Sequence, residues 1–129
     1  MQAMPQFPMI PERERILAKF PDYAVDIEPA GGTVTVSVGG EQVAASKGAL
    51  LVRETRHADV YYLPRADVDM SRLTPTDHST YCPFKGHASY WSIGDEDNIV
   101  WSYEDPYPEV DGLKNYLSFY VDRATISMS

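Results

Sequence analysis

Apolar and polar residues alternate along much of the chain with a period of two, which is typical of half-buried β-strands. The alternation is clearest at Val34, Val36 and Val38, which hydroxyl residues separate. After them, Gly39 and Gly40 favour a two-residue hairpin, because such turns need positive φ. Similar runs predict strands over residues 23–28, 41–46, 49–54, 60–63, 79–83, 87–93, 99–103 and 119–126. About ten short strands indicate a mainly β fold, either two antiparallel sheets or an open barrel.

Three kinds of segment do not follow this alternation. The first 11 residues contain three prolines and little pattern, which predicts an N-terminal tail. Acidic residues that follow Pro11 predict a short helix, which Pro21 stops. Single helical turns are expected around residues 70–73 and 113–116. The predicted organisation is a tail over 1–11 and one domain over 12–129, with a helix over 12–20 and sheets over 23–126.

Composition narrows the class of protein. The chain has 129 residues, 11 Lys and Arg against 19 Asp and Glu, and a net charge of −8. This length suits one domain, and no apolar run approaches the roughly 20 residues of a membrane helix. The negative charge argues against nucleic acid as a partner, because phosphates would be repelled. With one cysteine and no secretory signal pattern at its start, we expect a cytoplasmic protein.

The densest chemistry lies in residues 77–91, which contain Cys82, His78, His87 and Lys85. A thiol near an imidazole is the arrangement of a Cys/His-dependent enzyme, with Cys82 as nucleophile and His78 or His87 as base. The alternative is that Cys82 is a quietly buried apolar residue, as unpaired cysteines usually are. A zinc site normally takes four Cys or His ligands at close spacing. The chain has one cysteine and three histidines without such spacing, so we expect no metal and no other cofactor.

Aromatic residues suggest a binding site. Ten of the fifteen lie within residues 81–120, where they either fill the core or form the walls of a pocket. An arginine beside a buried strand pairs with a carboxylate or accepts an anionic ligand. We therefore predict a pocket between the sheets for a small polar or anionic molecule. The expected ligand-binding residues are Arg53, Glu54, Tyr61, Arg65, Tyr81, Lys85, Tyr90, Trp101 and Tyr103.

Several strings of residues resemble the domain-of-unknown-function family 427. The most specific is Tyr81-Cys82-Pro83-Phe84-Lys85-Gly86, and others are Leu51 to Glu54, Tyr61 to Arg65, Ala88 to Trp91 and Trp101 to Pro108. The resemblance covers roughly residues 23–124 and implies a small, mainly β, bacterial-type domain. The family also carries the label of a nucleotidyltransferase domain.

That label can be compared with the residues of this chain. Nucleotidyl transfer uses carboxylates that hold Mg²⁺, for which Asp67 and Asp69 are the candidates. The family usually has a basic residue where this chain has Asp69. The other explanation of both aspartates is a solvated loop or a capping role.

Three functions stay open from the sequence. The first is a protein that binds a small molecule. The second is an enzyme, by Cys82 chemistry or by nucleotidyl transfer. The third is a structural or interaction module without a ligand. A homodimer is compatible with each, because symmetric oligomers are common.

Overall fold

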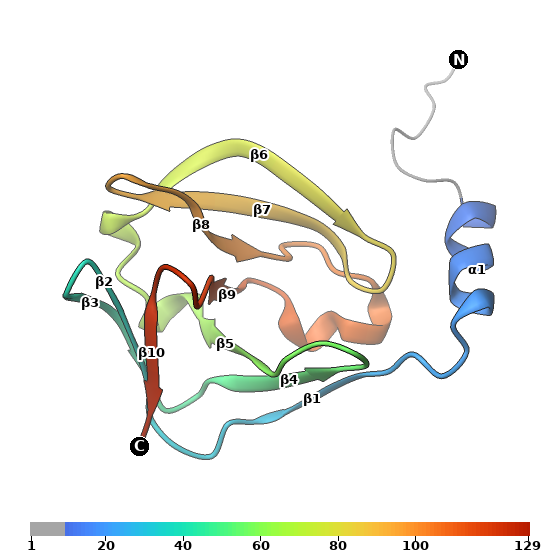
Figure 1. Cartoon of the computed structure of the whole chain (residues 1–129), viewed down its shortest axis with the longest axis horizontal. Coiled ribbons are helices and arrows are strands. Elements are labelled where there is room, and N and C mark those ends of the chain that lie inside the picture. Colours follow the sequence, from blue (N-terminus) through green and yellow to red (C-terminus); the bar gives the residue numbers. More distant parts are fainter. Residues whose placement is uncertain (1–9) are drawn as a thin grey trace.

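The computed structural model describes residues 10–129, which form one helix, ten strands and three 3₁₀ segments (Figure 1). The mainly β prediction is confirmed. The elements are α1 (Ile10–Lys19), β1 (Val25–Pro29), β2 (Val34–Val38), β3 (Glu41–Ser46), β4 (Leu50–Glu54), β5 (Val60–Pro64), η1 (Arg65–Asp67), η2 (Met70–Arg72), β6 (Thr74–Cys82), β7 (Gly86–Ile93), β8 (Glu96–Ser102), η3 (Pro108–Leu113), β9 (Tyr116–Phe119) and β10 (Thr125–Met128).

The strands form two antiparallel sheets. The larger sheet has seven strands in the order β1-β4-β5-β9-β8-β7-β6, and the smaller has the order β10-β2-β3. In Figure 1, β6, β7 and β8 lie above β9, and β5, β4 and β1 lie below it, so the larger sheet curls without closing into a barrel. The smaller sheet lies beside the curled sheet, on the side near β9.

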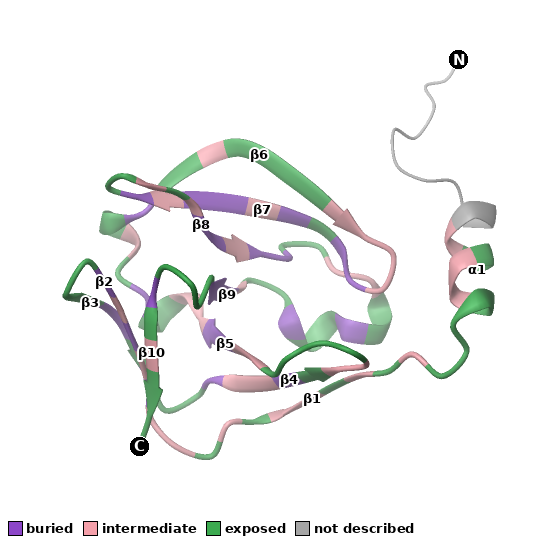
Figure 2. Ribbon diagram, in the orientation of Figure 1, coloured by how far each residue is buried: buried purple, intermediate pink, exposed green. Residues whose placement is uncertain are grey.

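Strand alternation gives the larger sheet two packed faces. One face packs with the smaller sheet around a core that includes Val36, Leu63 and Leu117. The opposite face carries a second core, which includes Tyr62 and Tyr90 and also residues of η3. Figure 2 shows the buried positions on the strands of both sheets and on η3. Each face therefore has its own apolar partner, and η3 covers part of the face that the smaller sheet leaves open.

Most predicted strands are present, but two predictions near the C-terminus are wrong. The expected strand over 119–126 is two strands in different sheets, and Ala124 N donates to Tyr120 O at 2.9 Å in the turn between them. The expected helical turn over 113–116 lies earlier, at Pro108–Leu113, where proline suits the first turn. Asn115 then adopts a φ of 65° and ends that segment before β9.

The structure covers only part of the predicted N-terminal tail and helix. Residues 1–9 of the expected tail lie outside the described residues, and α1 begins at Ile10, two residues earlier than expected. No helix within residues 10–129 is long and apolar enough to cross a membrane.

Leu113 tests whether η3 is needed for the second core. Its side chain is fully buried there, so Leu113→Ala should lower the free energy of unfolding by about 2–5 kcal/mol. Val121, which is 74% exposed, supplies the control. Val121→Ala should change the free energy of unfolding by less than about 0.5 kcal/mol. Urea denaturation measures both. Equal effects of the two substitutions would contradict the two-core description.

Candidate functional site

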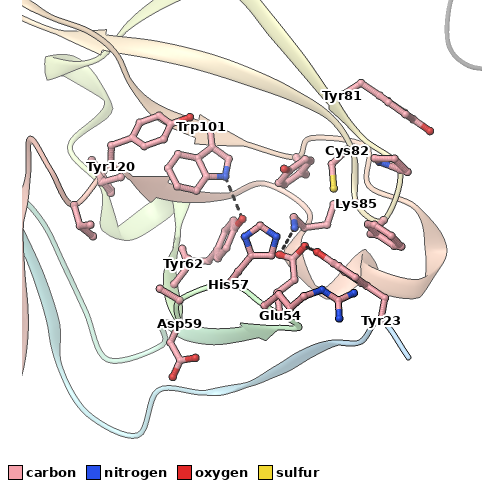
Figure 3. A pocket seen from close by; sticks show the side chains of 18 of the residues that line it. Tyr23, Glu54, His57, Asp59, Tyr62, Tyr81, Cys82, Lys85, Trp101 and Tyr120 are labelled. Carbon is pink, nitrogen blue, oxygen red and sulfur yellow. Dashed lines mark hydrogen bonds and ion pairs between the residues drawn. The ribbon is translucent and has the colours of Figure 1, made fainter. Parts of the chain in front are cut away.

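A cavity of about 800 Å³ opens on the face of the larger sheet that bears the second core (Figure 3). Its lining comes from strands β4 to β9, from the β4–β5, β6–β7 and β9–β10 turns, from Tyr103 just after β8 and from the segment that follows α1. No residue of β2, β3 or β10 lines it. The predicted aromatic-walled pocket therefore does not lie between the two sheets, because this cavity lies within the curl of the larger sheet.

A buried ion pair forms one wall of the cavity. Lys85 Nζ donates a hydrogen bond to Glu54 Oε1, and the Tyr23 hydroxyl donates to Glu54 Oε2 (Figure 3). The Lys85 side chain is 8% exposed and that of Glu54 is 11% exposed. Lys85 stands in the β6–β7 hairpin, where its backbone N–H bonds to Cys82 O at 3.2 Å. Both oxygens of the carboxylate are thus satisfied by groups from other parts of the chain.

Aromatic side chains form the remaining walls. Trp101 Nε1 donates to the Tyr62 hydroxyl at 3.1 Å, and the Tyr120 ring lies 4.6 Å from the Trp101 ring. The Tyr90 hydroxyl lies 2.9 Å from Thr80 Oγ1. These contacts fix the rings, so the wall is pre-formed.

Burial keeps several phenols of the cavity neutral. Desolvation is the largest cause that raises the pKa of Tyr62 and of Tyr103 well above the ordinary tyrosine value. Lys85 Nζ lies 5.9 Å from the centre of the Tyr103 ring. Within the described chain, the Tyr103 hydroxyl has no hydrogen-bond partner although the residue is only 7% exposed. It is a phenol that keeps its proton and has that proton to donate.

The structure brings six of the nine expected ligand-binding residues to the cavity: Glu54, Tyr81, Lys85, Tyr90, Trp101 and Tyr103. Tyr81 is the outermost of these, since its hydroxyl lies 2.6 Å from that of Tyr107 and Figure 3 shows it directed away from the ion pair.

Arg53, Tyr61 and Arg65 do not line the cavity. Arg53 and Tyr61 are sequence neighbours of Glu54 and Tyr62, and alternation along a strand turns neighbours to opposite faces. Arg53 pairs instead with Glu28 at 3.3 Å and with Asp59 at 3.5 Å. Arg65 pairs with Glu104 at 3.0 Å, and its guanidinium lies 5.1 Å from the Trp91 ring. The predicted cluster of Arg53, Arg65 and Lys85 is therefore not formed.

The structure also does not bring the three predicted catalytic residues together in the cavity. Half-buried Cys82 lines the cavity, whereas His78 and His87 do not. Their rings lie against Tyr90 at 4.5 Å and Tyr81 at 4.8 Å.

Other lining residues were not expected from the sequence; these include Phe20, Tyr23, His57, Tyr62 and Tyr120. The alternation of β5 could have predicted that Tyr62 lies in the lining. Tyr23 and Tyr120 fell within expected strands but lie just outside β1 and β9, and Phe20 and His57 lie in a connecting segment and a turn without alternation.

The aspartates considered for nucleotidyl transfer lie elsewhere. Asp67 Oδ2 accepts a hydrogen bond from Ser46 Oγ at 2.6 Å, and Asp69 accepts from Ser71 N at 3.2 Å at the start of η2. Neither lines the cavity. In the part of the chain that the structure describes, no group of three His, Cys, Asp or Glu side chains is placed to hold a metal ion.

The ion pair can be tested by breaking it on one side. Lys85→Met should cost about 3–5 kcal/mol of unfolding free energy, because it leaves the Glu54 carboxylate buried without its cation. The double variant Lys85→Met/Glu54→Leu should recover most of that cost. Arg53→Met removes an exposed pair as a control and should cost less than about 1 kcal/mol. Urea denaturation measures the free energy of unfolding of each variant. If the cost in the double variant equals the sum of the two single costs, the two side chains do not form a buried pair.

A second test uses alkaline pH. Burial is the largest cause that raises the pKa of Tyr81 and of Tyr120 to about 12, and it raises that of Tyr103 further. The folded state therefore favours the neutral phenols, so stability persists below the ordinary tyrosine pKa of 10.0 and falls as the pH rises above it. Urea denaturation from about pH 9 to about pH 11 should show that fall. Tyr103→Phe should make the fall less steep, and an unchanged slope would contradict the assignment.

Comparison with known proteins places the chain in a family. No curated protein matches the chain. A family model described as "Domain of unknown function (DUF427)" matches residues 26–129, which covers the ion pair, the aromatic walls and both sheets but not α1 or Tyr23. The match extends over most of the sequence and agrees with the strings around Cys82 and Trp101. The chain therefore belongs to the family of domain of unknown function 427.

Proposed function

We propose that this chain binds a small molecule with a planar apolar ring and one neutral polar group in the cavity beside Glu54 and Lys85. One observation carries the proposal. The cavity combines pre-formed aromatic walls with a buried wall of hydrogen-bonding groups, which is the usual composition of a small-molecule site. Its volume of about 800 Å³ lies in the range of such sites.

The rim of the cavity supports an apolar body for the ligand. Phe20, Tyr120, Val121 and Met128 are the exposed large hydrophobic residues of the described chain. Three of these, Phe20, Tyr120 and Val121, line the cavity. Exposed apolar groups that gather at one opening favour an apolar occupant, because covering them removes unfavourable contact with water.

The charges of the lining favour a neutral polar group. Glu54 and Asp59 are balanced by Arg56 and Lys85. The inner groups with donors to spare are the Tyr103 hydroxyl and the Lys85 ammonium, which has three N–H groups and shares one with Glu54. A carbonyl or amide oxygen would accept these hydrogen bonds without adding charge beside Glu54. An anionic ligand is less favoured than the sequence suggested, because Arg53 and Arg65 lie outside the cavity.

A second candidate is a reaction at Cys82. The observation in its favour is that the thiol lines the same cavity as Lys85. The imidazole in that lining is His57 rather than His78 or His87. Should the chain be a Cys/His-dependent enzyme, we therefore assign the base to His57.

Three probes that share one ring test the binding proposal: benzamide, benzoate and benzylamine. In a Trp91→Phe background, Trp101 is the remaining tryptophan and its emission reports on the cavity. Benzamide should change that emission and raise the thermal midpoint, with a roughly millimolar Kd as expected for so small a ligand. Benzoate and benzylamine should bind less tightly, because each adds a charge to a balanced lining.

Two tyrosines provide the matched variants. Tyr103→Phe removes the proposed donor and should weaken benzamide binding about tenfold. Tyr61→Phe removes a hydroxyl on the other face of the sheet and should leave binding unchanged. The proposal fails when none of the three probes alters Trp101 emission, or when Tyr61→Phe weakens binding as much as Tyr103→Phe does.

A further inference from the structure

We infer that the N-terminal arm, residues 10–24, completes the cavity, and that Tyr23 in it is a positioning residue which makes the site select hydrogen-bond acceptors. This inference rests on the proposed function and deepens it. The family match begins at residue 26, so the arm lies outside the matched domain. Yet the arm supplies Phe20 and Tyr23 to the cavity lining.

Arg13 holds the arm against the domain. Its Nε donates to the Pro83 carbonyl at 2.7 Å, and its guanidinium lies 3.6 Å from the centre of the Tyr107 ring. A second nitrogen pairs with Glu109 at 3.3 Å. The Arg13 side chain is only 17% exposed, although Glu109 itself is exposed, so the contacts to Pro83 and Tyr107 are the better shielded from water. One arginine thus joins α1 to the β6–β7 hairpin and to η3, which Figure 1 shows beside α1.

Tyr23 attaches the other end of the arm to the same hairpin. Its ring stacks on Phe84 with centroids 3.7 Å apart and planes inclined by 9°. Its backbone N–H bonds to Phe20 O at 3.0 Å, which sets the chain direction after α1. Pro83 and Phe84 directly precede Lys85, so the arm is anchored on the two residues that lead into the one carrying the ammonium.

The hydrogen bond from Tyr23 determines which groups the site offers. Glu54 accepts from Lys85 on one oxygen and from Tyr23 on the other, so each oxygen already has a protein donor and offers a ligand fewer acceptor sites. The donors to spare are the Tyr103 hydroxyl and the remaining N–H groups of Lys85, so the ion-pair wall offers mainly donors. Without the Tyr23 hydroxyl, one carboxylate oxygen would have no protein donor and would accept fully from a ligand. The arm therefore selects a ligand that accepts hydrogen bonds over one that donates them.

The covering role of the arm is tested without any ligand. In the Trp91→Phe background, acrylamide quenching of Trp101 measures access to the cavity. Arg13→Ala should raise the quenching constant about twofold, because the arm would open locally. Arg72→Ala is the matched control, since it removes an arginine paired with Glu41 far from the arm. Equal quenching in wild type and Arg13→Ala would overturn the covering role.

The selective role of Tyr23 is tested with Tyr23→Phe, which keeps the stacked ring and removes the hydroxyl. The ratio of benzylamine to benzamide affinity should shift about tenfold toward benzylamine, the size of one charge-assisted hydrogen bond. Caesium quenching of Trp101 should rise relative to iodide quenching, because a carboxylate oxygen becomes free. A Tyr23→Phe protein with both ratios unchanged would overturn this role.

The two proposals fail in different ways. Should no probe bind the wild-type chain, the proposed function falls, and the acrylamide and caesium measurements alone still decide whether the arm covers the cavity and occupies Glu54. Should benzamide bind while both Arg13→Ala and Tyr23→Phe behave as wild type, the proposed function stands and the inference about the arm is wrong.

Discussion

The contact between Glu54 and Lys85 sets the shape on which the site depends. Glu54 ends β4 and Lys85 precedes β7, and three strands separate β4 from β7 in the sheet order. In a flat sheet those strands would lie roughly 19 Å apart, because neighbouring strands are about 4.8 Å apart. The two side chains nevertheless form a direct ion pair. The sheet must therefore curl around the residues between them, and that curl encloses the cavity.

The curl also explains why the two cores differ in chemistry. The outer face of the curled sheet meets the smaller sheet, which contributes small aliphatic residues such as Val34, Val36 and Val43. The inner face has no second sheet against it, and large rings such as Tyr62, Tyr90 and Tyr103 occupy the space. Rings of this size bury much apolar area yet keep a polar tip that points into a cavity. Tyrosines thus predominate on the inner face, whereas aliphatic residues predominate on the outer face, which also holds Trp91 and Phe119.

The sequence predicted what is local and missed what depends on distant partners. Period-two alternation locates β2 and β3 and puts Trp101 and Tyr103 on one face, because both features follow from neighbouring residues. The same rule separates Arg53 from Glu54, but which face becomes a cavity depends on strand order, and alternation carries no information about that. The bond from Tyr23 to Glu54 joins positions 31 residues apart, and nothing near Tyr23 in the sequence signals it.

The matched region and the arm supply different groups to the same site. The matched region contains the ion pair and the rings, so it encodes the curl, the cavity and the donors of Lys85 and Tyr103. It does not contain the group that occupies the second oxygen of Glu54, which here comes from Tyr23. A buried carboxylate needs a donor at each oxygen, because an unsatisfied one carries a desolvation cost. In this chain, the donor that offsets that cost at Glu54 Oε2 therefore comes from a segment outside the matched region.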